Sequence, residues 1–217
     1  MSEPIIVTHT GKLGDFIYCL PVASWLAHKY NRGIHFVLPD SFHPFRYITP
    51  LLELQPFTEA VTLVPFRIAN FDCGGQPYKF DPGEFGILGS YFNFGFRHYP
   101  NKYLSAFYSE EYGVSYIDDF VLHYGDPPEP SGEILKSSEG AMLGFAKHAT
   151  PLPSVMDLLD LVRRLAAAKE VHSWYCGIAV LCYFARIPFH CYREKGHAAK
   201  EFFFPNDDLI TWHEVVR

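Results

Sequence analysis

The sequence predicts an α/β protein in which two successive halves of strand–helix alternation each form a parallel sheet. Three observations support this fold class. Short β-branched apolar runs alternate with segments whose apolar residues recur at helical spacing. A polar, proline-rich stretch at 126–133 (DPPEPSGE) separates the two halves. No uninterrupted apolar run approaches the roughly 20 residues of a membrane span, so we expect none.

The first half opens with a strand over 4–8, a glycine-containing loop, a helix over 16–30 and a strand over 33–38. Pro21 lies inside the helical run and is best tolerated in a first turn, so we expect Gly14 and Asp15 on the loop and a kink at Pro21. A β–loop–α–β unit of this kind joins parallel strands by a right-handed crossover.

The rest of the first half is less regular. We expect a short helix over 45–54 and a strand over 60–64. The stretch 70–99 is rich in glycine, proline and aromatic residues, which is typical of a lid or binding loop with one or two short strands. A helix over 102–112 follows.

In the second half we expect a strand over 140–145 and a helix over 154–168 that Ser154 caps, with Asp157 in a capping-box-like position. A strand begins at Glu170 and ends at His172–Ser173. The later expected elements are a helix over 176–185, a strand over 187–192 and a helix at the end of the tail 202–217. The predicted domains are a Rossmann-like lobe over 1–125, a linker over 126–133 and a shortened Rossmann-like lobe over 134–217.

Composition narrows the class of protein. Of the 217 residues 48% are hydrophobic and 19% charged, which is typical of a soluble globular chain, and the net charge of −6 disfavours a broad nucleic-acid footprint. Five cysteines without a CxxC pair, and no signal peptide in MSEPIIV, predict a cytoplasmic protein with reduced thiols. Eleven histidines show no HExxH or paired-ligand spacing, so we expect no metal site.

The loop between the first strand and helix is the strongest candidate site. In THTGKLGD (8–15), Gly11 and Gly14 let the backbone approach a ligand, and Lys12 adds a positive charge. Amide groups at the start of a helix favour a phosphate or carboxylate. Asp15 is either a helix cap or a general base, and neither nucleotide-binding glycine motif is present.

The run THTGKLGDFIYCLP resembles the N-terminal signature of the heptosyltransferase-like glycosyltransferases, family 9 of the GT-B class. It is most similar to small members of that family that carry an HTGxLGDxxYSLP motif. A second stretch, PLLELQPF at 50–57, resembles their PLLExQPY segment. The resemblance implies a compact GT-B-like fold with a shortened C-terminal lobe.

The resemblance also implies a reaction: a metal-independent, inverting transfer of a sugar from a nucleotide-sugar donor to a hydroxyl acceptor, with no cofactor. Asp15 matches the aspartate proposed as general base in the family, which takes the proton of the acceptor hydroxyl as the oxygen attacks the anomeric carbon. The residues that would hold the acceptor or a phosphate are Thr10, Gly11, Lys12 and Gly14.

The segment AKEVHSWYCG (168–177) matches the place where GT-B enzymes bind the nucleotide diphosphate. His172 would contact the sugar or diphosphate and Ser173 would donate to a phosphate. Equally, His172 is a buried polar residue and Ser173 an N-cap. Glu194 takes the position of an acidic residue near the nucleoside ribose.

Three alternatives to a transferase of this kind stay open. The first is a non-catalytic protein of the same fold that binds a nucleotide or sugar phosphate. The second is a glycosyltransferase acting on DNA bases, against which the acidic net charge argues. The third is a purely structural or assembly protein, which would bind no nucleotide.

Overall fold

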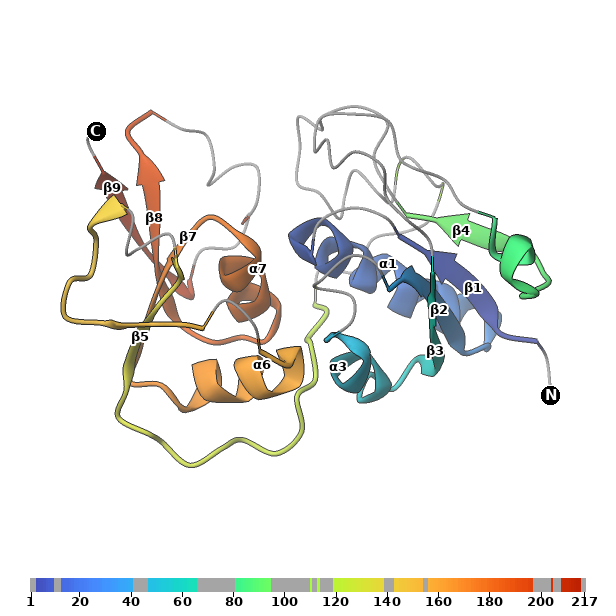
Figure 1. The fold of residues 1–217 in the computed structure, drawn as a ribbon, viewed down its shortest axis with the longest axis horizontal. Helices are drawn as coiled ribbons and strands as arrows, with labels where there is room; N and C mark the ends of the chain where they lie inside the picture. The colour runs from blue at the N-terminus through green and yellow to red at the C-terminus, as the bar shows by residue number, and fades with distance from the viewer. Residues whose placement is uncertain are drawn as a thin grey trace. The chain divides into compact units, whose positions relative to one another are not determined.

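The computed structural model describes residues 3–9, 13–40, 47–65, 81–94, 110, 113, 119–138, 143–153, 156–196, 204 and 208–215. The chain divides into two compact units, Met1–Phe120 and Val121–Arg217, each built on its own sheet (Figure 1). The α/β class with two parallel sheets is therefore confirmed. Within the described ranges, no helix combines the length and apolarity needed to cross a bilayer.

The first unit holds a four-stranded sheet in the order β3–β2–β1–β4, with every neighbouring pair parallel. Helix α1 (Leu13–Tyr30) connects β1 to β2, the short helix α3 (Thr49–Glu53) precedes β3, and the 3-10 helix η1 (Pro82–Phe85) precedes β4. The strands are β1 (Ile5–Thr8), β2 (Ile34–Pro39), β3 (Thr58–Val64) and β4 (Tyr91–Asn93).

Both faces of this sheet are covered, which is why its central strands are mostly apolar. Helix α1 packs on one face, where the buried rings of Phe16 and Phe36 meet edge-to-face at 5.6 Å. On the other face Ile6, Val37 and Val64 form a buried cluster, against which Phe85 and Ile87 pack.

The second unit holds a five-stranded parallel sheet in the order β6–β5–β7–β8–β9. Helices α6 (Leu158–Ala167) and α7 (Gly177–Phe184) lie on the same side of this sheet (Figure 1), as right-handed crossovers in one direction require. The strands are β5 (Ile134–Lys136), β6 (Thr150–Pro151), β7 (Glu170–Trp174), β8 (Phe189–Glu194) and β9 (Ile210–Val215).

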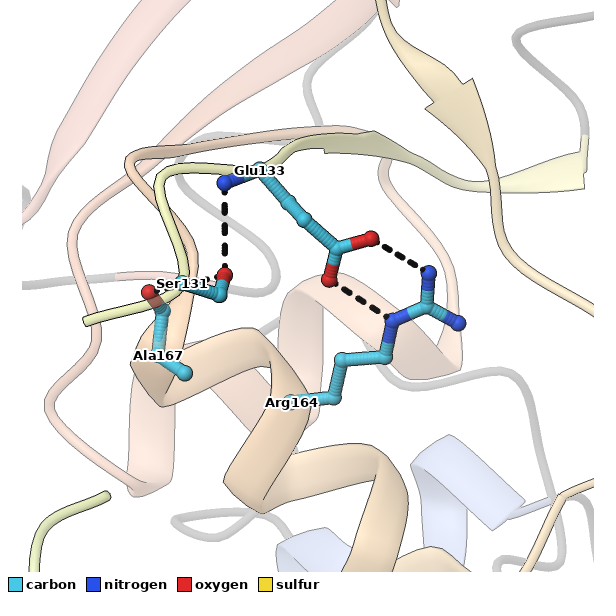
Figure 2. A network of polar contacts seen from close by, with 4 residues as sticks. All are labelled: Ser131, Glu133, Arg164 and Ala167. Atoms are coloured by element: carbon cyan, nitrogen blue, oxygen red, sulfur yellow. Dashed lines mark hydrogen bonds and ion pairs between the residues drawn. The ribbon is translucent and has the colours of Figure 1, made fainter. Parts of the chain in front are cut away.

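The segment before β5 is fastened to helix α6 by a small polar network (Figure 2). Arg164 donates two hydrogen bonds to the Glu133 carboxylate, at 2.8 and 3.1 Å, and holds the pKa of that carboxyl below its usual value. The Ser131 amide donates to the carbonyl of Ala167 at 2.8 Å, and the Glu133 amide donates to the Ser131 hydroxyl. The end of α6 and the start of β5 are thereby held together.

Helix α1 differs from the prediction at its start. It begins at Leu13, so Gly14 and Asp15 lie in its first turn and not on the loop. Pro21 lies inside the helix and is buried, although it removes one helical hydrogen bond and its ring crowds the carbonyl four residues earlier.

Three expectations for the second unit are wrong. No strand is present in residues 143–145, the described part of the predicted 140–145 strand, and the first strand is instead β5. Asp157, rather than Ser154, caps the long helix, which begins at Leu158. The tail ends in strand β9 and not in a helix, because its alternating residues pair with β8 along six positions. Apart from Glu110, the predicted helix over 102–112 lies outside the described residues.

Candidate functional site

The first unit has a topological switch point between β1 and β4. From β1 the chain passes through α1 to β2 on one side, whereas β4 lies on the other side of β1. In open parallel sheets, ligands bind beyond the carboxyl ends of the strands at such a point. The register pairs Thr8 with Asn93 there, so the ends of β1 and β4 define the candidate site of this unit.

The N-terminus of α1 contributes the predicted site residues to this edge. Gly14 and Asp15 are partly exposed, while Phe16 directly after them is fully buried. The first-turn amides of a helix have no acceptor within the helix, and they carry its positive partial charge. The start of α1 therefore combines amides that favour a polar or anionic group with the carboxylate of Asp15. The other predicted loop residues, Thr10, Gly11 and Lys12, lie outside the described residues.

Asn93 is a candidate residue of this site that no sequence motif indicated. The residue is only 7% exposed, yet neither its amide nitrogen nor its amide oxygen has a hydrogen-bond partner among the residues that the structure describes. Leaving such a group unpaired costs about 1–3 kcal/mol, so buried polar groups of this kind call for an explanation such as a ligand. The available signal was an asparagine that ends a short aromatic strand, YFN, within an otherwise irregular stretch.

His9 follows β1 and is fully buried against the ring of Phe16, at a centroid distance of 5.4 Å. Burial lowers the pKa of His9 to about 3, so the imidazole is neutral near pH 7. A neutral His9 does not supply a positive charge to a phosphate. Charge at this edge must come from the helix amides and from other side chains.

The second unit has its own switch point between β5 and β7, because β5 leads to β6 at one edge and β7 leads through α7 to β8 on the other side. Ser137 follows β5 and accepts a hydrogen bond from the Trp174 amide at 3.3 Å. Cys176 is the N-cap of α7, and its side chain makes no capping hydrogen bond. The start of α7 therefore lies at the edge where a ligand is expected, and helix amides of this kind favour anions.

The predicted donor-binding residues occupy different positions relative to that edge. Strand β7 continues to Trp174, so His172 and Ser173 lie inside the strand and are buried. The Ser173 hydroxyl donates to the carbonyl of Trp174 at 2.8 Å. Glu194 is the last residue of β8 and is partly exposed, which places it at the carboxyl edge.

A cluster of histidines occupies the face of this sheet opposite α6 and α7. His172 stacks on His190 with a centroid distance of 4.5 Å, and His190 Nδ1 lies 2.9 Å from His213 Nε2. His148, Glu170 and His172 offer ligand atoms that all lie within 4.8 Å of one another. Sequence motifs did not reveal this group because its members come from separate segments. The only sequence signal was a period of two at 170–172 and 190–192.

The comparisons with known proteins support the fold. No family model and no curated protein matches the chain. Among solved structures, a family 9 glycosyl transferase from Veillonella parvula matches with a TM-score of 0.62 and 12% identity, over 98% of this chain and 86% of that one. E. coli heptosyltransferase WaaC with ADP matches with a TM-score of 0.56 and 12% identity, over 97% and 93% of the two chains.

A third solved structure is the iron-containing dodecameric glycosyltransferase TibC from enterotoxigenic E. coli, with a TM-score of 0.58 and 13% identity. That alignment covers 95% of this chain and 64% of TibC. Sequence identities this low indicate a shared architecture and nothing finer. The chain thus has the GT-B-like α/β fold of family 9 glycosyltransferase structures, as the sequence predicted.

Proposed function

We propose that the protein is a glycosyltransferase that moves a sugar from a nucleotide-sugar donor to a hydroxyl acceptor with inversion. The observation that carries the proposal is the position of Asp15. It is a partly exposed carboxylate in the first turn of α1, at the carboxyl edge of a parallel sheet. In the proposed step Asp15 takes the acceptor proton, the acceptor oxygen bonds to the anomeric carbon, and the nucleoside diphosphate leaves.

The acceptor is proposed to bind at the edge formed by β1 and β4. The unpaired Asn93 amide offers one donor group and one acceptor oxygen, which suits a ligand rich in hydroxyl groups. Gly14 allows close approach of the ligand to the start of α1. The roles of Thr10, Gly11 and Lys12 in the preceding loop stay predictions from the resemblance.

The donor is proposed to bind at the switch point of the second unit. The amides at the start of α7 would take charge from the leaving diphosphate, and Glu194 would meet the ribose. His172 and Ser173 would support this edge from inside β7. Support for the donor class comes from WaaC, which has been solved with ADP and with ADP-2-deoxy-2-fluoro heptose. As proposed, the transfer step uses no metal ion and no cofactor.

We further propose that the protein works in the reducing cytoplasm. Cys19, Cys182 and Cys191 are buried thiols that form no disulfide. Burial raises the pKa of Cys19 and Cys182, which keeps them protonated and unreactive.

The decisive variant is Asp15→Asn, which keeps the side-chain shape and removes the base. We expect transfer to fall by about 10²–10⁴-fold, the usual contribution of a general base, with donor affinity unchanged. The matched control is Glu53→Gln, an exposed carboxylate at the end of α3 in the same unit. Transfer would be measured against a panel of nucleotide sugars, and donor affinity by calorimetry.

Each other result contradicts a different part of the proposal. If Asp15→Asn transfers as fast as Glu53→Gln, Asp15 is not the base. If the wild type binds nucleotide sugars but transfers none of them to any hydroxyl acceptor, the protein is a binding protein of the same fold. If no nucleoside diphosphate or nucleotide sugar raises its melting temperature, the donor assignment is wrong, because a ligand that binds only the native state must stabilise it.

A further inference from the structure

Three side chains of metal-ligating type converge on the sheet of the second unit. Glu170 and His172 are two residues apart on β7 and therefore point to the same face. His148 comes from the segment that precedes β6, and its ring meets that of His172 edge-on at 5.5 Å. Their ligand atoms all lie within 4.8 Å of one another.

The ring of His172 is oriented by a contact with Tyr192. Its Nδ1 lies 3.0 Å from the hydroxyl of Tyr192, while its buried Nε2 faces Glu170 Oε2 at 3.4 Å and has no aligned hydrogen bond within the described residues. When Nδ1–H donates to the Tyr192 oxygen, the Nε2 lone pair points away from it and is available to a cation. Metal-binding histidines are usually held in this way, with the second ring nitrogen donating to an outer partner.

The spacing of Glu170 and His172 fits a small cation. Glu170 Oε2 lies 3.4 Å from His172 Nε2. Two ligands bound at about 2.0–2.1 Å to a tetrahedral zinc ion lie about 3.3 Å apart. The other Glu170 oxygen, Oε1, lies 4.0 Å from the ammonium of the exposed Lys169. The ammonium group is therefore paired with Oε1, whereas Oε2 faces the imidazole of His172.

The third side chain is brought to the site by an anchored segment. Lys136 pairs with His172 in the sheet register, and its ammonium group donates a hydrogen bond to the carbonyl of Ala146 at 3.1 Å. This contact holds the segment two residues before His148 against the sheet. His148 itself is exposed and Glu170 partly exposed, so the group is open to solvent on one side. Solvent access allows an ion to enter and water to complete its coordination.

We propose that His148, Glu170 and His172 bind a divalent transition-metal ion of the zinc class. Two imidazoles and one carboxylate suit borderline ions such as Zn²⁺ or Co²⁺, whereas Mg²⁺ and Ca²⁺ prefer sets of oxygen ligands. The bound ion would tie the segment 143–149 to β7.

The test is titration of the untagged, chelator-treated full chain with Zn²⁺ by calorimetry and with Co²⁺ by visible absorption. We expect one tightly bound ion per chain and visible d–d bands with Co²⁺, but no binding of Mg²⁺. His148→Ala and Glu170→Gln should each weaken Zn²⁺ binding by at least about 10-fold, because even the loss of an outer partner costs 10–100-fold. Tyr192→Phe should weaken it within that range while keeping the ring.

The matched control is His28→Ala, an exposed histidine in the last turn of α1, which should bind zinc as the wild type does. Because His148 is exposed, His148→Ala is expected to keep the fold, which circular dichroism checks. The proposal is overturned if no stoichiometric binding occurs, or if His148→Ala and His28→Ala have equal affinity. These readouts involve no sugar transfer, so they are independent of the outcome for Asp15.

Discussion

Two polar side chains at the carboxyl edge of the first sheet are buried where apolar ones would favour folding more. His9 is fully buried, and Asn93 is nearly so with both polar atoms unpaired. The unpaired Asn93 amide lowers the stability of the folded chain relative to an apolar residue of similar size. The presence of both side chains at the end of adjacent strands, next to the start of α1, is consistent with a site kept at the expense of stability.

The buried His9 predicts a specific loss of stability in acid. Its pKa is about 3 in the folded chain against 6.5 for an exposed histidine. Between these values the unfolded state takes up a proton that the folded state does not. The contribution of neutral His9 to the free energy of unfolding is thus fully present above pH 6.5. It is lost as the pH falls toward 3, by up to about 1.4 kcal/mol per pH unit.

Urea unfolding of wild type and His9→Gln at several pH values between 7 and 4 measures how much His9 contributes to the pH dependence of the free energy of unfolding. Glutamine does not titrate, so the free energy of unfolding should fall less steeply for the variant, and the difference in slope should approach one proton. Parallel pH profiles would mean that His9 is not held neutral in the folded chain.

Replacing Asn93 by an apolar residue should stabilise the folded chain and weaken ligand binding. Asn93→Val removes the unpaired amide and places a β-branched residue in β4, so we expect the free energy of unfolding to rise by about 1–3 kcal/mol. The same change should weaken acceptor binding and raise the KM for acceptor.

The matched control for Asn93 is Thr58→Val at the opposite, amino-terminal end of β3. It removes another unpaired buried polar atom and should raise stability without affecting the acceptor. Thermal and urea unfolding report stability, and steady-state kinetics report the KM. A destabilised Asn93→Val would show that the amide contributes to folding itself.

At the scale of elements, helix α6 shows how local sequence and packing agree. Its buried residues Leu158, Leu161, Val162 and Leu165 follow helical spacing along one face. Its start is defined by Asp157, whose carboxylate accepts hydrogen bonds from the amides of the two residues after Leu158. Its end is tied to the segment before β5 by the Arg164–Glu133 pair.

Loss of the Asp157 cap should therefore destabilise α6. We expect Asp157→Ala to lower the free energy of unfolding by about 1 kcal/mol, the usual cost of removing an N-cap side chain. Asp126→Ala, an exposed acidic residue before β5, controls for the change in charge. Equal urea midpoints for the two variants would rule out a stabilising role for the cap.

At the scale of the whole molecule, two sheets each place a switch point and a helix N-terminus at one edge. This repetition underlies the match to family 9 glycosyltransferase structures at only 12–13% identity. A parallel sheet requires a pattern of apolar strands and amphipathic helices rather than particular residues, so very different sequences can form the same fold. The chemistry must be tested at the sites themselves.

Elements defined by neighbouring residues were predictable. Apolar periodicity along the chain indicates five of the elements, namely β1, α1, β2, β7 and α7. The THTGKLGD loop indicates the sheet edge at which Asp15 lies. The tail was mistaken for a helix because its strand exists only through pairing with β8. The sequence predicts too late a start for α1, because proline favours a first helical turn whereas Pro21 lies in the interior of this helix.

The sequence by itself therefore determined the α/β alternation, the division into two halves and the candidate loop, since each depends on local periodicity and turn residues. Only the tertiary structure decided that Asn93 is buried without a partner and that His148 meets Glu170 and His172. The physical reason is that burial and ligand geometry are set by sheet register and by crossovers. These bring His148 to Glu170 and His172, although no spacing along the chain relates it to them.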